Sequence, residues 1–158
     1  MTNLTRNSPR EFHGSPPDGS VLALPASANT RYWDGAALMK DATTGALISC
    51  TPTASGKFAG ICIEEKDNRT GSPYGGTAGS TTVQVQTRGP VWLDVANASN
   101  WARGDELTVH ASDDNTFTTD AGTNNIVIGK SCLIPESVIG AATGRVLVAI
   151  EGSAMRSI

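Results

Sequence analysis

The sequence predicts an all-β fold, a small barrel or sandwich of short strands that follows an extended N-terminal arm. Apolar residues alternate with polar ones over short stretches such as 82–86 and 145–151, and this period of two puts every second side chain on one face of a strand. The 17 glycines and 8 prolines among 158 residues match short strands joined by many turns. No stretch longer than about ten residues shows the 3.6-residue period of an amphipathic helix.

An N-terminal arm is predicted over residues 1–30. Four of the eight prolines fall in it, and its compact apolar piece is Val21-Leu22-Ala23-Leu24. Such a segment buries too little surface to offset its own ordering entropy. We therefore expect it to be disordered in isolation, or ordered on a neighbouring surface by adding a strand to an exposed sheet edge. The predicted contact residues are Val21, Leu22 and Leu24.

A β-rich domain is predicted over residues 31–158, beginning near Arg31-Tyr32-Trp33. Strands are expected where apolar residues alternate between turn signals. These stretches are residues 36–39, 46–50, 58–63, 82–86, 91–95, 107–109, 126–134 and 145–151.

The connections follow from turn residues and from segments without periodicity. Asp113-Asp114-Asn115 is predicted at the tip of a hairpin. Residues 98–103 are expected to make one helical turn, and residues 135–143 a loop. Residues 64–80 are predicted to form one long loop, and a loop of this length inside a small domain is usually functional or disordered.

No converging catalytic or metal-binding set is visible in the sequence. The two histidines are His13, in the arm, and His110, which the alternation places on the solvent side of its strand. The Gly-x-Ser-x-Gly elbow of many hydrolases is absent. Asp113, Asp114 and Asp120 lack the ligand spacing of a calcium loop and are typical of turns. We therefore expect no enzymatic activity, no cofactor and no metal site.

Charge and cysteine content narrow the class of partner. The net charge is −3 and the 12 Lys and Arg residues are scattered singly, so we expect no nucleic-acid partner, which would require a basic stripe. No apolar stretch approaches the roughly 20 residues of a membrane helix, and the start of the chain shows no signal-peptide pattern. Cys50, Cys62 and Cys132 show no close pairing, which favours a reducing compartment.

A fixed order of short motifs runs through most of the chain. A strand with Phe58-Ala59-Gly60-Ile61 and a loop are followed by Gly89-Pro90-Val91, Gly104-Asp105, Leu107-Thr108-Val109, Phe117-Thr118, Ile128-Gly129 and a valine-rich strand. In this order and spacing, Trp33 to Gly152 resembles the capsid decoration (cement) proteins of tailed bacteriophages. The loop at 64–80 is longer than in that pattern.

The resemblance implies a compact, non-enzymatic β-domain that assembles as a homotrimer on the outer surface of the phage head, in a virion assembled in the host cytoplasm. Its partners would be the major capsid protein and further copies of itself. It would hold the shell against the pressure of packaged DNA, with the arm reaching over neighbouring capsid subunits. Deleting residues 1–25 is then expected to leave a folded domain that no longer binds shells.

Trp92 and Trp33 are the residues predicted at the subunit interface of such a trimer. Trp92 alternates with Val91 and Leu93, so it leaves the face that those two residues share. It either covers a second packed layer or lies at a subunit contact, where aromatic residues are enriched.

Two other functions stay open at this point. A receptor- or carbohydrate-binding module of a phage fibre or spike would use Tyr74 and Trp101 at loop tips to stack on sugar rings, although no repetitive shaft is visible. A small hydrolase would need titratable groups that converge on a residue such as His110.

Overall fold

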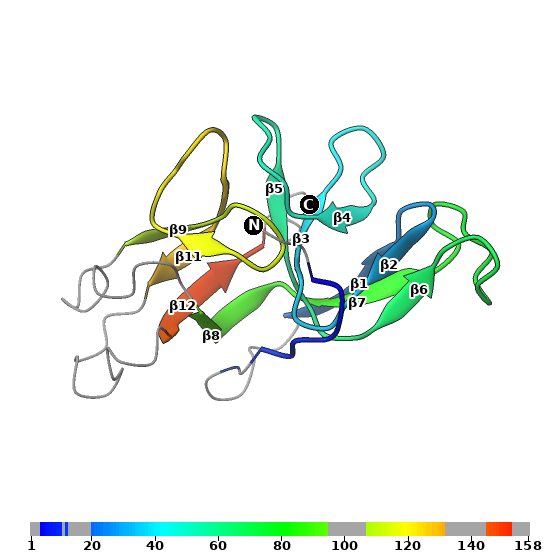
Figure 1. Cartoon of the computed structure of the whole chain (residues 1–158), viewed down its shortest axis with the longest axis horizontal. Helices are drawn as coiled ribbons and strands as arrows, with labels where there is room; N and C mark the ends of the chain where they lie inside the picture. Colours follow the sequence, from blue (N-terminus) through cyan, green and yellow to red (C-terminus); the bar gives the residue numbers. More distant parts are fainter. Residues whose placement is uncertain (1–3, 11, 13–19, 95–106, 132–144, 153–158) are drawn as a thin grey trace.

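The computed structural model describes residues 4–10, 12, 20–94, 107–131 and 145–152, and these residues form an all-β fold. Strands β1 to β12 succeed one another along the chain, with no helix among the described residues. They form two five-stranded sheets and a two-stranded ribbon (Figure 1). The predicted fold class, a small sandwich or barrel of short strands, is confirmed.

The first sheet is built from the earlier strands, in the order β1-β7-β5-β3-β4. Their bounds are Val21–Pro25 (β1), Thr82–Gln86 (β7), Lys57–Cys62 (β5), Ala37–Lys40 (β3) and Leu47–Ser49 (β4). The ribbon pairs β2 (Thr30–Tyr32) with β6 (Lys66–Asn68) and lies on the side of the first sheet that is remote from the second (Figure 1).

The second sheet has the order β10-β9-β11-β12-β8. Its strands are Phe117–Thr118 (β10), Thr108–Ala111 (β9), Ile126–Ser131 (β11), Arg145–Glu151 (β12) and Arg88–Asp94 (β8). Only Thr87 separates β7 from β8, so the chain passes directly from the first sheet into the second.

The main core lies between the two sheets, where β5 contacts both β11 and β12. It is formed by apolar side chains from both sheets, including Met39, Phe58, Ile61, Val91, Val109, Ile128 and Val148. Each such side chain stabilises the fold by about 1.5–3 kcal/mol when it leaves water. The packing of the two sheets is therefore the main source of stability.

A second core covers the opposite face of the first sheet. It contains Tyr32, Leu38, Leu47, Ala59, Cys62, Val83 and Val85, with Leu4 and Leu24 packed against it. The Tyr32 hydroxyl donates a 2.7 Å hydrogen bond to the carbonyl of Leu47, and burial raises the pKa of Tyr32. Because both faces of the first sheet are covered, β5 is buried at every position except its first.

A bulge in β11 brings two strands of the second sheet close together. The register between β11 and β9 shifts between Val127 and Gly129. A Cβ atom at Gly129 would lie 2.0 Å from the carbonyl oxygen of Ala149 in β12. The Ile128-Gly129 step therefore marks a position where only glycine allows the neighbouring backbone to approach.

The structure differs from the sequence-based organisation at two places and agrees with it at the Asp113 hairpin. Val21–Pro25 belongs to the first sheet rather than to a separate arm, because it pairs with β7. The expected long loop at 64–80 contains β6. The hairpin with Asp113-Asp114-Asn115 at its tip is present as β9 and β10, whereas residues 98–103 and 135–143 lie outside the described part of the chain.

Candidate partner-binding surface

An N-terminal strap, formed by residues 4–10 and Phe12, is fastened to the folded domain (dark blue in Figure 1). The N–H of Ser8 donates a 2.7 Å hydrogen bond to the carbonyl of Asp34. In return, the N–H of Asp34 donates to Oδ1 of Asn7 at 3.0 Å. This part of the predicted arm is therefore ordered on its own domain.

Arg10 of the strap contacts residues beside both sheets. Its Nε donates to the carbonyl of Gly35 at 3.0 Å, and a terminal nitrogen donates to Oδ1 of Asn115 at 2.6 Å. Its guanidinium lies 5.4 Å from the ring centroid of Phe117, within cation–π range. Phe12 then forms a β-bridge with β8. The strap thus spans the junction of the two sheets.

Gly35 allows the strap to lie this close. Its φ is +92°, a conformation that L-residues rarely adopt. A Cβ atom there would lie only 1.7 Å from the carbonyl oxygen of Ser8. The Asp34-Gly35 step, which the sequence predicts only as a turn, is therefore also the position on which the strap packs.

Asp114 is a contact of the strap that the sequence does not reveal. It is 2% exposed, and its Oδ1 accepts a 2.8 Å hydrogen bond from the N–H of Leu4. Burial raises the pKa of Asp114. Asp113 has the predicted turn role, since it accepts from the N–H of Asn115 and the hydroxyl of Thr116. Within the described residues, no three side chains of the metal-ligating types form a cation site.

β1 brings the three predicted contact residues into the first sheet with different exposure. Val21 is 42% exposed, whereas Leu22 and Leu24 are half-buried. Leu24 packs against the second core of its own chain. The expectation that Leu24 fills a pocket on a partner therefore conflicts with its position here, and the accessible side chains of β1 are Val21, Ala23 and Pro25.

The main chain of β1 exposes hydrogen-bonding groups at every second residue. The N–H of Thr87 donates to the carbonyl of Ser20, and the N–H of Ala26 donates to the carbonyl of Thr81. These pairs are in register with the β1–β7 ladder, so the even-numbered residues point their N–H and C=O groups toward β7. The odd-numbered residues, Val21, Ala23 and Pro25, therefore point theirs away from the sheet.

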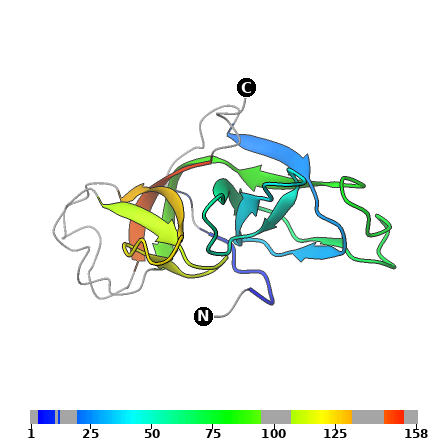
Figure 2. The same cartoon turned by 90° about the horizontal axis from the view of Figure 1, so that it is seen from above.

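β1 is the open edge among the described strands of the two sheets. The far edge of β4 is bridged by Ala26 and that of β8 by Phe12, and β10 has two residues. β1 has five residues and carries no charge. It lies at the rim of the molecule, as the upper of the two blue strands in Figure 2. Long uncharged edges are templates for pairing with another chain.

The two predicted interface tryptophans lie in different parts of the fold. Trp92 is half-buried in β8, on the face opposite the fully buried Val91 and Leu93. Its partner across the ladder, Leu147, is 4% exposed, so this face is packed around Trp92. Trp33 follows β2, and the Arg31 guanidinium lies 4.0 Å from its ring centroid.

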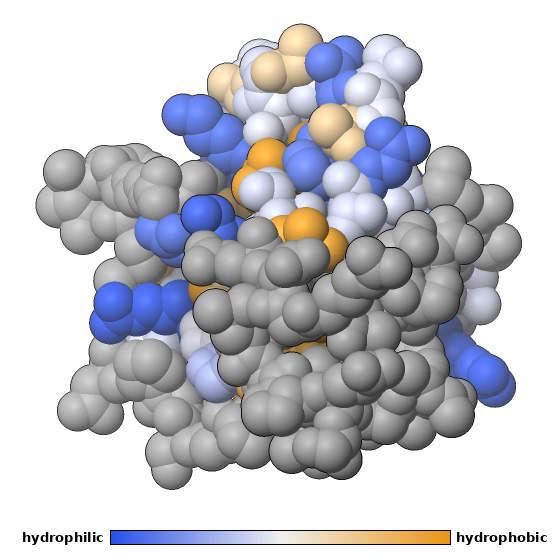
Figure 3. Space-filling model, turned by 90° about the vertical axis from the view of Figure 1, so that its left-hand side faces the viewer, coloured by the Kyte–Doolittle hydropathy of each residue, from blue (hydrophilic) through white to orange (hydrophobic). Residues whose placement is uncertain are grey.

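The side of the molecule that carries the second sheet is mixed in character. Hydrophobic areas (orange) are visible there between hydrophilic side chains (blue) (Figure 3).

The expected long loop carries charged pairs beside the ribbon. Glu65 binds Arg31 and accepts from Nδ2 of Asn7, and these contacts lower the pKa of Glu65. Lys66 lies 3.5 Å from Glu64. Tyr74, proposed for sugar stacking, is 41% exposed with the Lys66 ammonium 5.2 Å from its ring centroid. Trp101, its expected companion, lies outside the described residues.

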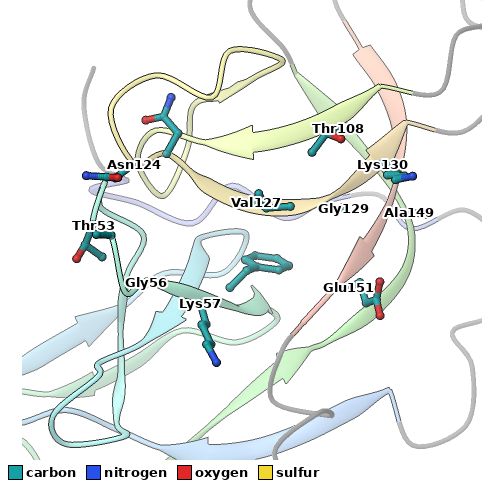
Figure 4. Close-up of a pocket in the computed structure, with 13 residues that line it drawn as sticks. Thr53, Gly56, Lys57, Thr108, Asn124, Val127, Gly129, Lys130, Ala149 and Glu151 are labelled. Atoms are coloured by element: carbon teal, nitrogen blue, oxygen red, sulfur yellow. The ribbon is translucent and has the colours of Figure 1, made fainter.

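An open groove separates the start of β5 from β11 and β12. Its volume is about 950 Å³, and its lining includes Phe58 and the 55% exposed Val127. Figure 4 shows Thr53 and Asn124 at one end of the groove and Lys130 and Glu151 at the other. The described residues that line it include no histidine, cysteine or serine.

The described cysteines are buried thiols. Cys50 and Cys62 are free, and burial raises the pKa of Cys62 to about 12. They behave as small apolar side chains. Cys132 lies outside the described residues.

His110 is buried in β9, with 9% of its surface exposed, so its predicted solvent-side position is wrong. The alternation identifies which face of the strand it occupies but not whether that face is covered. Its Nδ1 has no hydrogen-bond partner among the residues that the structure describes. Burial lowers the pKa of His110, and the charge of Asp120 opposes this shift.

The free energy of unfolding is expected to decrease as the pH falls through about 6.5, the ordinary pKa of histidine. Because the pKa of His110 is lower in the fold, the unfolded chain binds the proton first, and protonation favours unfolding. Urea unfolding at about pH 7.5 and about pH 5.5 measures the decrease. We expect it to shrink in His110→Gln and to persist in the control His13→Gln. An equal decrease in wild type and His110→Gln would contradict this assignment.

One family model matches the chain. It is described as structural cement protein (E217 gp24/Pam3 gp6) and matches residues 4–151, a range that includes the strap and all twelve described strands. No curated protein and no solved structure matches. Among the described residues there is no helix long and apolar enough to cross a membrane.

Proposed function

Because the chain belongs to the family of phage structural cement proteins, we propose that it binds the outer surface of a phage head and stabilises the shell by non-covalent contacts with neighbouring major capsid subunits. Members of this family are structural proteins of the capsid and bind its shell proteins. The outer location, the identity of the contacted subunit and the stabilising action are the proposal. The observation that carries it is the combination of the family match with the open edge of β1.

In this proposal the strap holds the two sheets of the domain in a fixed arrangement. It ties the two sheets together through Arg10 and Asp114, so force on one sheet is passed to the other. A preorganised domain also loses less conformational entropy on binding than a free arm would. Adhesion would then depend on a preformed surface and not on the ordering of residues 1–30.

Shells that lack the cement protein provide the test. We expect the purified protein to bind them saturably in a sedimentation assay and to raise the temperature at which they disrupt. Failure to bind, or binding without any change in the disruption temperature, would contradict the proposal.

The protein is further proposed to act as a homotrimer with Trp92 and Trp33 at its subunit contacts. A cyclic trimer joins two different patches of each subunit, and these half-buried tryptophans lie on β8 and after β2. Three linked copies would bind a shell with high effective concentration. The trimer would thus compensate for a small contact area per subunit.

Trp92→Ala is expected to convert a trimer into monomers while circular dichroism stays that of the folded chain. Removing a central interface aromatic typically costs binding about 2 kcal/mol or more. Sedimentation velocity measures the change, with Tyr74→Ala, at an exposed position on the loop, as the matched control. A monomeric wild type, or a trimer that persists in Trp92→Ala, would refute this interface.

A further inference from the structure

We propose that the open edge of β1 takes up an extended, uncharged segment of a shell protein as an additional strand of the first sheet. This inference rests on the proposed function and names the surface and the binding mode. It reverses the mechanism expected from the sequence, in which Val21 to Leu24 would leave the domain and join a sheet of the capsid.

The hydrogen-bonding groups of β1 are arranged for this. The even-numbered residues bond to β7, which leaves the N–H and C=O groups of Val21 and Ala23 and the C=O of Pro25 directed outward. A strand laid along this edge can use all of these groups with the usual spacing of a β-ladder. Main-chain bonds of this kind supply affinity in strand addition, and alternate side chains supply specificity.

The other sheet edges are partly covered or short, so the exposed edge of β1 is the one that indicates a binding surface. An isolated bridge from Ala26 covers β4 at Leu47, one from Phe12 covers β8 at Val91, and β10 is two residues long. The described chain thus protects three of four sheet edges by shortening or covering them, as soluble β-proteins do. β1 has neither a lysine nor a bulge, and Pro25 alone interrupts its outward groups.

Pro25 favours a different chain over a second copy of β1 as the occupant. Two β1 strands pairing antiparallel about Ala23 would place Val21 opposite Pro25, which has no N–H to donate. Each side of such a pair would lose one hydrogen bond. It would also be a two-fold contact, which builds dimers and not trimers.

The side chains on this edge define the chemistry of the partner segment. Val21, Ala23 and Pro25 are exposed and uncharged, and cross-strand neighbours in a sheet pair by like character. We therefore expect small or β-branched side chains opposite them, and no charge.

Ala23→Pro tests the inference because it removes an outward N–H and leaves the β1–β7 bonds in place. Proline is tolerated on an edge strand where its missing N–H faces outward, so the urea midpoint should stay near that of wild type. Affinity for shells should fall on the order of tenfold or more, the equivalent of about 1.4 kcal/mol. Ala23→Ser, which keeps the N–H, should bind as wild type does. The N–H of Leu22 points at β7, so Leu22→Pro removes a bond within the first sheet and should be unstable.

The outcomes separate the two proposals. If wild type fails to bind shells, the proposed function is overturned. If wild type and Ala23→Pro bind shells equally, only the strand addition at β1 is overturned. If wild type self-associates and Ala23→Pro abolishes the self-association without changing shell binding, the edge serves a second copy, and the assignment to a shell protein is wrong.

Discussion

Removal of residues 1–25 is expected to unfold the domain, because Val21–Pro25 is a strand of the first sheet. This replaces the expectation from the sequence alone that a folded domain would remain. The truncation would take away the strap and β1, and with them the hydrogen bonds that Leu4, Ser8 and Arg10 make to the body of the domain. It would also remove Ser20, whose carbonyl accepts bonds from the N–H and the hydroxyl of Thr87. Leu24 would no longer cover the second core.

The size of the expected loss exceeds what a small domain tolerates. Each hydrogen bond contributes about 0.5–1.5 kcal/mol, and each buried apolar side chain about 1.5–3 kcal/mol. Their sum is comparable with the whole stability of a typical domain, about 5–15 kcal/mol. Far-UV circular dichroism and urea unfolding should therefore show no cooperative transition. The control Ala23→Ser keeps the strap and β1 and should unfold as the unchanged chain does. A truncated chain with an unchanged urea midpoint would contradict the account.

Gly35→Ala is expected to have the second largest effect, a loss of about 3–5 kcal/mol in the free energy of unfolding. The methyl group would collide with the carbonyl of Ser8, 1.7 Å away, at a φ of +92°. The strained φ alone costs about 1–2 kcal/mol. The collision displaces the strap, so its bond from Arg10 to the carbonyl of Gly35 is lost as well. Urea unfolding measures the change.

Gly45→Ala is the matched control. Gly45 also has a positive φ, +70°, but a Cβ atom there meets nothing within 4 Å. This variant should lose only the conformational cost, about 1–2 kcal/mol. Equal losses in Gly35→Ala and Gly45→Ala would show that the contact between the strap and Gly35 contributes nothing.

Local patterns predicted most strands correctly because alternation depends on neighbouring residues alone. The stretches 82–86 and 145–151 are β7 and β12, and Val91 and Leu93 share the buried face of β8, as expected. The alternation was uninformative for β5, where both faces are buried. A face that is covered by another part of the chain looks the same in sequence as one that is not, which is why His110 was misplaced.

Long-range pairing could not be predicted from the sequence. Val21 to Leu24 was identified as an extended apolar piece, but its partner β7 lies about sixty residues further along the chain, and nothing local specifies that pairing. Nothing local specifies the hydrogen bond from Leu4 to Asp114 or the packing of the strap on Gly35 either. That Val21, Leu22 and Leu24 bind a partner stays a prediction, and the structure shows that Val21 and Ala23 are exposed whereas Leu22 and Leu24 are half-buried.

Electron cryo-microscopy of shells saturated with the purified protein would test the proposed mode of attachment most directly. We expect density for this domain on the outer surface of the shell, with a strand of a shell subunit continuing the first sheet beside β1. Density on the inner surface, or a bound domain whose β1 edge faces solvent, would contradict the account.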